Sequence, residues 1–322
     1  MNDRARFEAT ALAVEREADR LGAVTPPMPA VHELFYEEVA CSCALAGSRL
    51  TAAEVRPLLD RDVVAPGRSL ADNVMVADYG HAARFVRSAP PSRRRTFLSL
   101  EEIANLHAFA ARRSLDARPG RWRERTAAPF PSGMVPPPAW LVPRAIAAYV
   151  ERFASGPRDQ AGRVAWIADA HERLLRIHPF DTANGRVTRL VTNLLLRRTG
   201  LPPFVVRRRD AARYVAALRR ADSRDPWPLA EVFARSLLES LGGLLAGADG
   251  ADPLQPLARF AVGSERAALY KAAQRGRLQT VRRDDALLTK RAWIDAYRSA
   301  RPRAAASEEP HDGDDPRNAR PR

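Results

Sequence analysis

Residues 178–189 read HPFDTANGRVTR, and this stretch decides the fold and the place of the functional site. A histidine and a Pro-Phe turn are followed by Ala-Asn-Gly and then by two arginines three residues apart. The apolar run 190–196 that follows predicts a buried helix. Its first turn combines unpaired backbone N–H groups, the positive end of the helix dipole and two guanidinium groups, which predicts an anion site suited to several phosphates.

This segment resembles the signature of the Fic family, which reads histidine-Pro-Phe-x-(Asp or Glu)-Gly-Asn-Gly-Arg-x-x-Arg. Most members of that family transfer AMP from ATP to a hydroxyl of a protein. Two positions depart from the signature. Ala183 replaces the first Gly, and Thr182 stands where the family keeps the carboxylate that holds Mg²⁺, with Asp181 one position too early.

The resemblance implies a role for each signature residue. His178 would deprotonate a Ser, Thr or Tyr hydroxyl of the target protein, and the alternative is a structural histidine at a helix end. The backbone around Ala183, with Asn184 and Gly185, would surround the phosphates. Arg186 and Arg189 would neutralise the departing pyrophosphate, whereas two arginines at this spacing are otherwise typical of a solvated face.

The resemblance also implies ATP and Mg²⁺ as cofactors, and Thr182 puts the metal in doubt. A Thr hydroxyl is a neutral ligand, so we expect weakened Mg²⁺ binding and slower transfer, with Asp181 as the neighbouring carboxylate. Residues 213–222 resemble the family's Tyr-Tyr-x-x-Leu segment near the adenine. Tyr214 is there a candidate base contact, and a core helix residue is the alternative.

An inhibitory motif, Ser-x-x-x-Glu-Gly, precedes the core in many Fic proteins, and its Glu pairs with the second signature arginine. Residues 42–47 read SCALAG at the corresponding place. Ser42 and Gly47 match the motif, and Ala46 replaces the Glu. We therefore expect Arg189 to lack an acidic partner and to be free for the nucleotide.

Composition sets wider limits. The 322 residues provide room for two domains, and the formal net charge of +14 favours nucleic acid or acidic partners. There is no apolar run near the roughly 18 residues that a membrane span needs, and the N-terminus does not read as a signal peptide, which favours the cytoplasm. Cys41 and Cys43 have no Cys or His cluster nearby, so they predict no zinc site.

Helical periodicity dominates the chain, so the expected fold class is mainly α, and the Pro-rich segment 117–143 suits a small β-hairpin flap. The resemblance implies that the helices form a Fic-type bundle. Extended pieces are expected around 122–126 and 133–135. The expected division is an N-terminal helical region 1–95, a Fic core 96–245, a linker 246–256, a C-terminal module 257–301 and a disordered tail 302–322. Helices are expected at 1–23, 31–59, 69–88, 99–113, 143–157, 162–177, 184–199, 208–222 and 228–246.

The C-terminal module resembles a small winged helix-turn-helix of the excisionase or MerR-like kind. Helices at 257–262, 264–275 and 291–297 surround two short strands, 278–283 and 286–289, which would form the wing. The same basic surface is also compatible with a solvated face or a protein contact. The residues expected to approach DNA are Arg266, Lys271, Gln274, Arg275 and Arg277, with Arg282 and Arg283 on the wing.

Two functions follow from these observations. The first is a Fic enzyme that transfers AMP from ATP to a hydroxyl of a protein target. The second is a Fic scaffold with damaged catalysis that regulates DNA or joins a toxin–antitoxin-type system through its C-terminal module. The retained histidine and arginines favour the enzyme, and Thr182 favours the scaffold. The sequence leaves a homodimer open.

Overall fold

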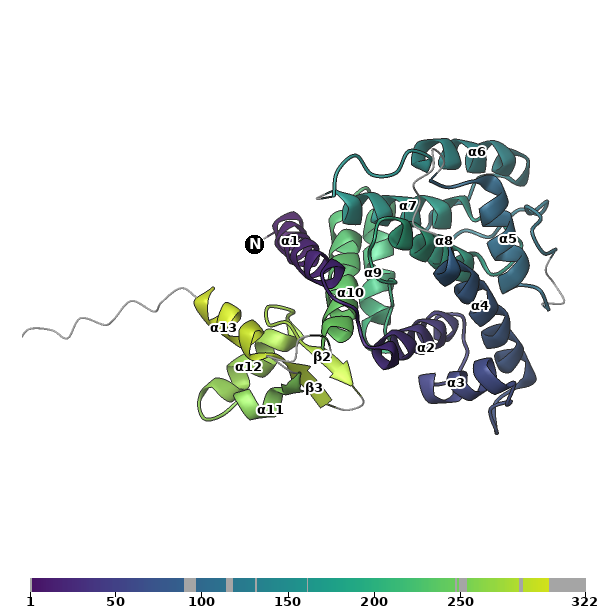
Figure 1. The fold of residues 1–322 in the computed structure, drawn as a ribbon. Coiled ribbons are helices and arrows are strands. Elements are labelled where there is room, and N and C mark those ends of the chain that lie inside the picture. Colours follow the sequence, from purple (N-terminus) through teal and green to yellow (C-terminus); the bar gives the residue numbers. More distant parts are fainter. Residues whose placement is uncertain are drawn as a thin grey trace, which may run out of the picture.

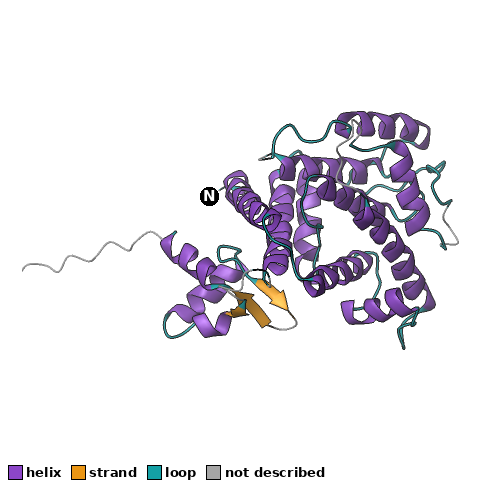
Figure 2. Ribbon diagram, in the orientation of Figure 1, coloured by secondary structure: helices purple, strands orange, loops and turns teal. Residues whose placement is uncertain are grey.

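The computed structural model of the chain describes residues 2–89, 97–113, 118–130, 132–160, 162–246, 248, 254–283 and 286–300. These parts form a body of α-helices and a smaller C-terminal unit that contains all the strands described (Figures 1 and 2). The expected tail 302–322 and the expected wing turn at residues 284–285 lie outside the described residues. No helix in the described ranges combines the length and the apolar character that a membrane crossing requires.

The helices of the body follow the expected segments closely, apart from one. Capping side chains define several starts, such as Asn2, Ser69 and Ser99, whose side chains accept hydrogen bonds from first-turn amides. The body's elements are α1 (Asp3–Gly22), α2 (Met28–Ala44), α3 (Ala52–Arg61), α4 (Leu70–Ser88), α5 (Leu100–Ala110), η1 (Ala139–Leu141), α6 (Val142–Phe153), α7 (Arg163–Ile177), α8 (Asn184–Arg198), η2 (Arg208–Asp210), α9 (Ala211–Asp222) and α10 (Trp227–Leu245).

The single helix expected over 31–59 is wrong, because two helices occupy this region. Helix α2 ends at Ala44, and Gly47 turns the chain with a φ of +99°, which side-chain-bearing residues rarely adopt. Thr51 and Glu54 then form a capping box that begins α3. The sequence contains this capping pair, but apolar periodicity continues on both sides of it. The start of a second helix was therefore missed.

Helix α8 is the central helix of the body. It contacts α2, α4, α5 and α7, and its residues from Arg186 to Leu196 are all buried. One hydrophobic core runs from Phe7 in α1 to Leu241 in α10. The N-terminal helices therefore share their core with the helices that surround the signature loop, and this shared packing holds α2 beside α8.

The C-terminal unit has a core of its own, built around residues such as Leu257, Leu269 and Ile294. Its antiparallel sheet has the strand order β1-β3-β2, and the short strand β1 lies within the segment expected to be only a linker. Trp293 and Val281 pack where α10 carries Gly242, since a Cβ there would lie 2.8 Å from the Trp293 ring. The elements are β1 (Gln255–Pro256), α11 (Leu257–Phe260), α12 (Glu265–Gln274), β2 (Val281–Arg283), β3 (Ala286–Thr289) and α13 (Arg291–Ser299).

The segment expected to form a β-hairpin flap contains no paired strands in its described part. A turn closes it instead: the Phe130 N–H donates to the Met134 carbonyl (2.8 Å), and the Gly133 N–H donates to the Phe130 carbonyl (2.9 Å). We keep the name flap for residues 124–138. Its prolines explain the difference, because proline lacks the N–H that a strand ladder needs.

Candidate functional site

The loop between α7 and α8 contains two residues in the left-handed backbone region. His178 follows α7 directly, with φ 50° and ψ 58°, and Ala183 precedes α8 with φ 61° and ψ 9°. Non-glycine residues adopt this region at a cost of roughly 1–2 kcal/mol. The loop therefore places the histidine at the end of one helix and returns the chain to the start of the next.

Asn184 holds this loop closed. Its side-chain oxygen accepts a hydrogen bond from the Phe180 N–H (2.9 Å), and its Nδ2 donates to the Phe180 carbonyl (2.8 Å). The amide of Asn184 is thus engaged by the loop, so it positions the backbone. Within the described residues no side chain caps α8, which leaves its first-turn N–H groups available to an anion.

The ring of His178 is half-buried beneath the flap. The Phe130 ring meets it edge to face, with ring centroids 5.1 Å apart. Burial lowers the pKa of His178 below its ordinary value, the nearby Arg123 guanidinium lowers it further, and the Leu175 carbonyl offsets part of that shift. The imidazole is therefore neutral at neutral pH, which is the state of a general base.

The two signature arginines are buried and face different neighbours. Arg186 donates from Nη1 to the Ala110 carbonyl at the end of α5 (2.8 Å), and burial lowers its pKa. Arg189 lies against Gly185, because a Cβ on Gly185 would lie 3.3 Å from Arg189 Nη1. Gly185 thus gives the guanidinium room beside the first turn of α8.

Arg189 is not free, contrary to the expectation from the sequence. Its Nε donates to Ser42 Oγ (2.7 Å) and its Nη2 donates to the Ser42 carbonyl (2.8 Å). Arg189 forms no ion pair within the described residues, although its charge acts on the buried carboxyl of Glu38. Ala46 is exposed beyond the end of α2, next to Gly47.

A second buried layer lies behind Ser42, and sequence reasoning missed it. Glu38, one turn earlier on α2, accepts hydrogen bonds from the Tyr79 hydroxyl and from Asn193 Nδ2. Burial raises the pKa of Glu38 to about 7, although Tyr79 and Arg189 both act to lower it. A carboxylate on an otherwise apolar helix face was the available signal.

The residues near Thr182 do not form a metal site by themselves. Thr182 offers a neutral hydroxyl, and the Asp181 carboxylate is bound by Arg118, whose Nη2 lies 3.2 Å from Oδ2. In the part of the chain that the structure describes, no group of three His, Cys, Asp or Glu side chains is arranged to hold a metal ion. The donor set therefore does not match a carboxylate-based Mg²⁺ site.

Tyr214 lies in the core of the body. Its hydroxyl is 2.8 Å from His171 Nε2, and His171 Nδ1 is 2.8 Å from Thr192 Oγ1. The side chain is buried, so of the two interpretations of Tyr214 the geometry supports the core residue. It is not exposed for contact with a base in this structure.

Arg123 joins the flap to the signature loop, a role that the sequence analysis did not assign. Its Nε donates to the His178 carbonyl (2.7 Å), and its Nη1 and Nη2 donate to the flap carbonyls of Arg125 and Pro137. Its backbone N–H donates to the Pro179 carbonyl (2.8 Å). Only 3% of this arginine is exposed. Local sequence patterns did not reveal this contact, because it joins residues 55 positions apart.

The residues expected to approach DNA lie on and beside α12, apart from the signature loop. Arg266 and Lys271 are on the helix, Arg275 ends it and Arg277 follows in the next turn, and all four are exposed. The carbonyl of Arg275 accepts a hydrogen bond from Arg235 Nη1 of α10 (3.1 Å). The end of α12 therefore rests on the helical body.

Comparison with known proteins identifies the family. A model described as the Fic/DOC family matches residues 97–196, which include the signature loop. A protein adenylyltransferase Fic from Nematostella vectensis is 24% identical over 237 residues, which cover 72% of this chain and 55% of the relative. The chain thus spans about half the length of this curated relative.

Two solved structures share the fold. A Fic-1 fragment from C. elegans superposes with a TM-score of 0.60 at 22% identity, over 75% of this chain and 70% of that one. A Fic domain containing signaling protein from Bacteroides thetaiotaomicron gives a TM-score of 0.62 at 19% identity, over 73% and 96% of the two chains. The chain is therefore a Fic/DOC family protein and a distant homologue of the protein adenylyltransferases called Fic.

Proposed function

We propose that this chain is a protein adenylyltransferase that transfers AMP from ATP to a Ser, Thr or Tyr hydroxyl of a protein target. The observation that carries the proposal is the loop between α7 and α8. It places a neutral histidine at one end and the uncapped start of α8, with two buried arginines, at the other. The relatives named as protein adenylyltransferases support the same activity.

In this proposal His178 accepts the proton of the target hydroxyl. The hydroxyl oxygen then attacks the α-phosphorus of ATP, and the bond to the pyrophosphate breaks, so that AMP is joined to the target and pyrophosphate leaves. The first-turn amides of α8 and the Arg186 and Arg189 guanidinium groups would stabilise the charge on the phosphates. Arg189 must exchange its bonds to Ser42 for this contact.

Mg²⁺ would accompany ATP only weakly in this proposal. Thr182 has no charge to offer it, and Arg118 already neutralises Asp181. We therefore expect transfer to be slowed, by about 10²–10³ for a lost catalytic contact of this kind. The steps assigned above use only the side chains and backbone of this chain.

A catalytically impaired scaffold is the second candidate. The Thr182 position favours it, and the C-terminal unit, with a helix α12 and a small antiparallel sheet, favours a winged helix-turn-helix that binds DNA through Arg266, Lys271, Arg275 and Arg277. We propose 257–301 as that module, 96–245 as the Fic core, 1–95 as the N-terminal helical region and 246–256 as the linker. A toxin–antitoxin-type role belongs to this second candidate, whereas a homodimer is compatible with either candidate.

Labelling of the purified protein with α-³²P-ATP separates the two candidates. The reaction is run with Mg²⁺ or Mn²⁺ on the wild type, His178→Ala and Thr182→Asp. Label on the wild type that disappears in His178→Ala supports the transferase. Label only on Thr182→Asp shows a competent site with a disabled metal position, and no label on wild type or Thr182→Asp supports the scaffold.

A further inference from the structure

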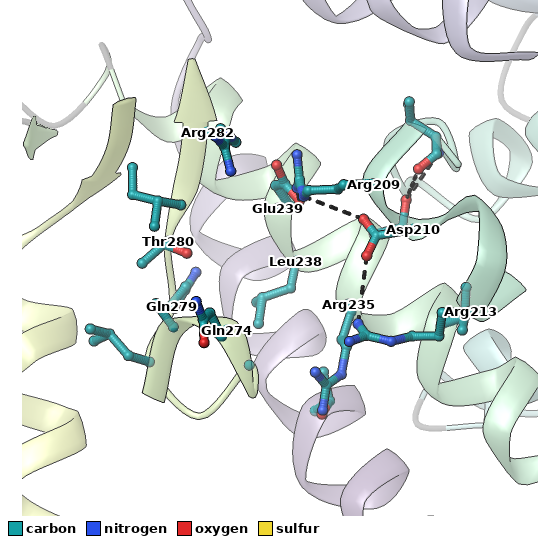
Figure 3. A pocket seen from close by; sticks show the side chains of 18 of the residues that line it. Arg209, Asp210, Arg213, Arg235, Leu238, Glu239, Gln274, Gln279, Thr280 and Arg282 are labelled. Atoms are coloured by element: carbon teal, nitrogen blue, oxygen red, sulfur yellow. Dashed lines mark hydrogen bonds and ion pairs between the residues drawn. The ribbon is translucent and has the colours of Figure 1, made fainter. Parts of the chain in front are cut away.

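A cavity of about 310 Å³ lies between the helical body and the C-terminal unit, away from the signature loop. Figure 3 shows Gln279, Thr280 and Arg282 of the C-terminal unit facing residues of η2, α9 and α10. Its volume is at the lower end of the range for small-molecule sites, and such sites favour interfaces between domains. No step of the proposed transfer uses this cavity.

The lining carries an excess of positive charge. Four arginines and two carboxylates face the cavity. Glu239 pairs with Arg209, and Asp210 lies 3.5 Å from both Arg209 and Arg213. These carboxylates hold Arg209 and Arg213 at the wall, and Arg235 pairs with Glu231 of its own helix. Only the fourth arginine has no carboxylate partner among the described residues.

Arg282 is that fourth arginine. It projects from β2 and forms no hydrogen bond or ion pair with the residues that the structure describes. The Nε2 of Gln279, in the same wall, is buried and also has no partner in the described ranges. Buried amide donors are nearly always paired in proteins, so an unpartnered one at a cavity wall indicates a missing acceptor.

The wall is held in place by a close contact between the two parts. Arg235 of α10 bonds to the Arg275 carbonyl, and it lies so near Gly276 that a Cβ there would be 2.2 Å from its Nη1. Gly276 has a φ of +64°, so glycine at this position permits both the left-handed turn after α12 and the close approach of the Arg235 side chain. The cavity is therefore built by a specific docking of α12 on α10.

The lining also includes apolar side chains, such as Leu238 and Leu278. Apolar lining suits a flat ring, and arginine with an amide donor suits a phosphate. We propose that this cavity binds a small molecule of the mononucleotide class, with Arg282 and Gln279 contacting its phosphate. A ligand that touches both parts would stabilise their docking.

Calorimetric titration of the full chain with AMP tests the proposal. Arg282→Gln and Gln279→Leu are the test variants, and Arg259→Gln is the matched control, because it removes an exposed arginine from α11 that does not line the cavity. We expect saturable binding that weakens roughly tenfold or more in each test variant and is unchanged in the control. Adenosine, which lacks the phosphate, should bind to the wild type at least as weakly as AMP binds to Arg282→Gln.

Binding at the signature loop is a separate component and stays equal in all four proteins, so it does not obscure the result. AMP isotherms that are identical in the wild type and both test variants would overturn the proposal. So would equal affinities for AMP and adenosine, since the phosphate would then make no contact. Circular dichroism and a thermal melt of each variant exclude loss of binding through unfolding.

Discussion

Arg189 of α8 is bound by a single residue of α2, because Ser42 accepts one of its hydrogen bonds at Oγ and another at the backbone carbonyl, at 2.7 and 2.8 Å. The contact joins the second signature arginine to α2. The residues that resemble the inhibitory motif, 42–47, begin near the end of this helix. The α2 helix thus holds this guanidinium without a Glu at position 46. Any nucleotide that uses Arg189 must compete with Ser42.

Ser42→Ala should destabilise the fold by about 1–3 kcal/mol, because it removes a hydrogen-bond acceptor from a buried charged group. It should also strengthen ATP binding, since Arg189 loses one of the two bonds that compete with the nucleotide. Urea denaturation and calorimetric titration with ATP measure the two effects.

Ser48→Ala is the control, because Ser48 is also buried and, among the described residues, its Oγ accepts a hydrogen bond only from the Leu50 N–H. We expect it to cost about 0.5–1.5 kcal/mol and to leave ATP affinity unchanged. Weaker ATP binding in Ser42→Ala would show that Ser42 orients Arg189 for the nucleotide and does not restrain it.

Glu38 should make the protein less stable as pH rises. Its pKa is about 7 in the fold and near 4.5 when exposed, so between these values the folded state keeps a proton that the unfolded state has released. The stabilising contribution is complete below pH 4.5 and is lost as pH rises through 7, a change of about 3 kcal/mol. Urea denaturation of the wild type and Glu38→Gln at pH 5, 6, 7 and 8 gives the two slopes. A wild-type slope equal to that of Glu38→Gln contradicts this assignment.

Sequence patterns predicted the helices of the body well, because apolar periodicity and capping residues are local signals. The loop from His178 to Asn184 was also predictable, because its residues lie within the signature. Contacts that join distant segments were not predictable: Arg123 reaches the His178 carbonyl across 55 positions, and Arg189 reaches Ser42 across 147. Such pairings depend on how the helices pack, which periodicity does not encode.

The position that stayed open and the two that were misjudged have the same cause. Tyr214 lies on a helix whose buried face became known only with its neighbours, and its hydroxyl bonds to His171 inside the core. The free Arg189 was inferred from one missing Glu, whereas a serine on the same helix supplies the partner. Residues 31–59 were joined into one helix because the turn near Gly47 is flanked by apolar residues on both sides.

Ala183→Gly should stabilise the fold by roughly 0.5 kcal/mol. Alanine at φ 61° costs about 1–2 kcal/mol, which glycine avoids, while the greater freedom of glycine in the unfolded chain offsets about 0.4–1 kcal/mol of the gain. Ala216→Gly is the control, because Ala216 is exposed within α9 and the same change there should destabilise by about 0.5–1 kcal/mol. Destabilisation by both changes would show that Ala183 is not strained in solution.

The transfer reaction should retain its rate to lower pH than an ordinary histidine allows. Burial and Arg123 lower the pKa of His178, so a larger share of the imidazole is neutral and able to accept a proton at mildly acidic pH than for an ordinary histidine. The acid limb of the rate of AMP transfer, measured from pH 5 to 8.5, should therefore be centred below pH 6.5. An acid limb centred above pH 6.5 would mean that the imidazole is stabilised in its charged form, contrary to the geometry of the site.

Arg123→Lys should slow transfer by about 10–100-fold while the protein stays folded. Lysine keeps the charge and lacks the planar guanidinium that donates to the His178 carbonyl and to two flap carbonyls. Both the His178 imidazole and the flap should therefore lose their alignment. Arg121→Lys is the matched control, because Arg121 is exposed and only its backbone forms a described hydrogen bond. Transfer rates and limited proteolysis of residues 124–138 measure the effect. An unchanged rate with faster cleavage of the flap would restrict Arg123 to holding the flap, and His178 would then be aligned by the left-handed turn alone.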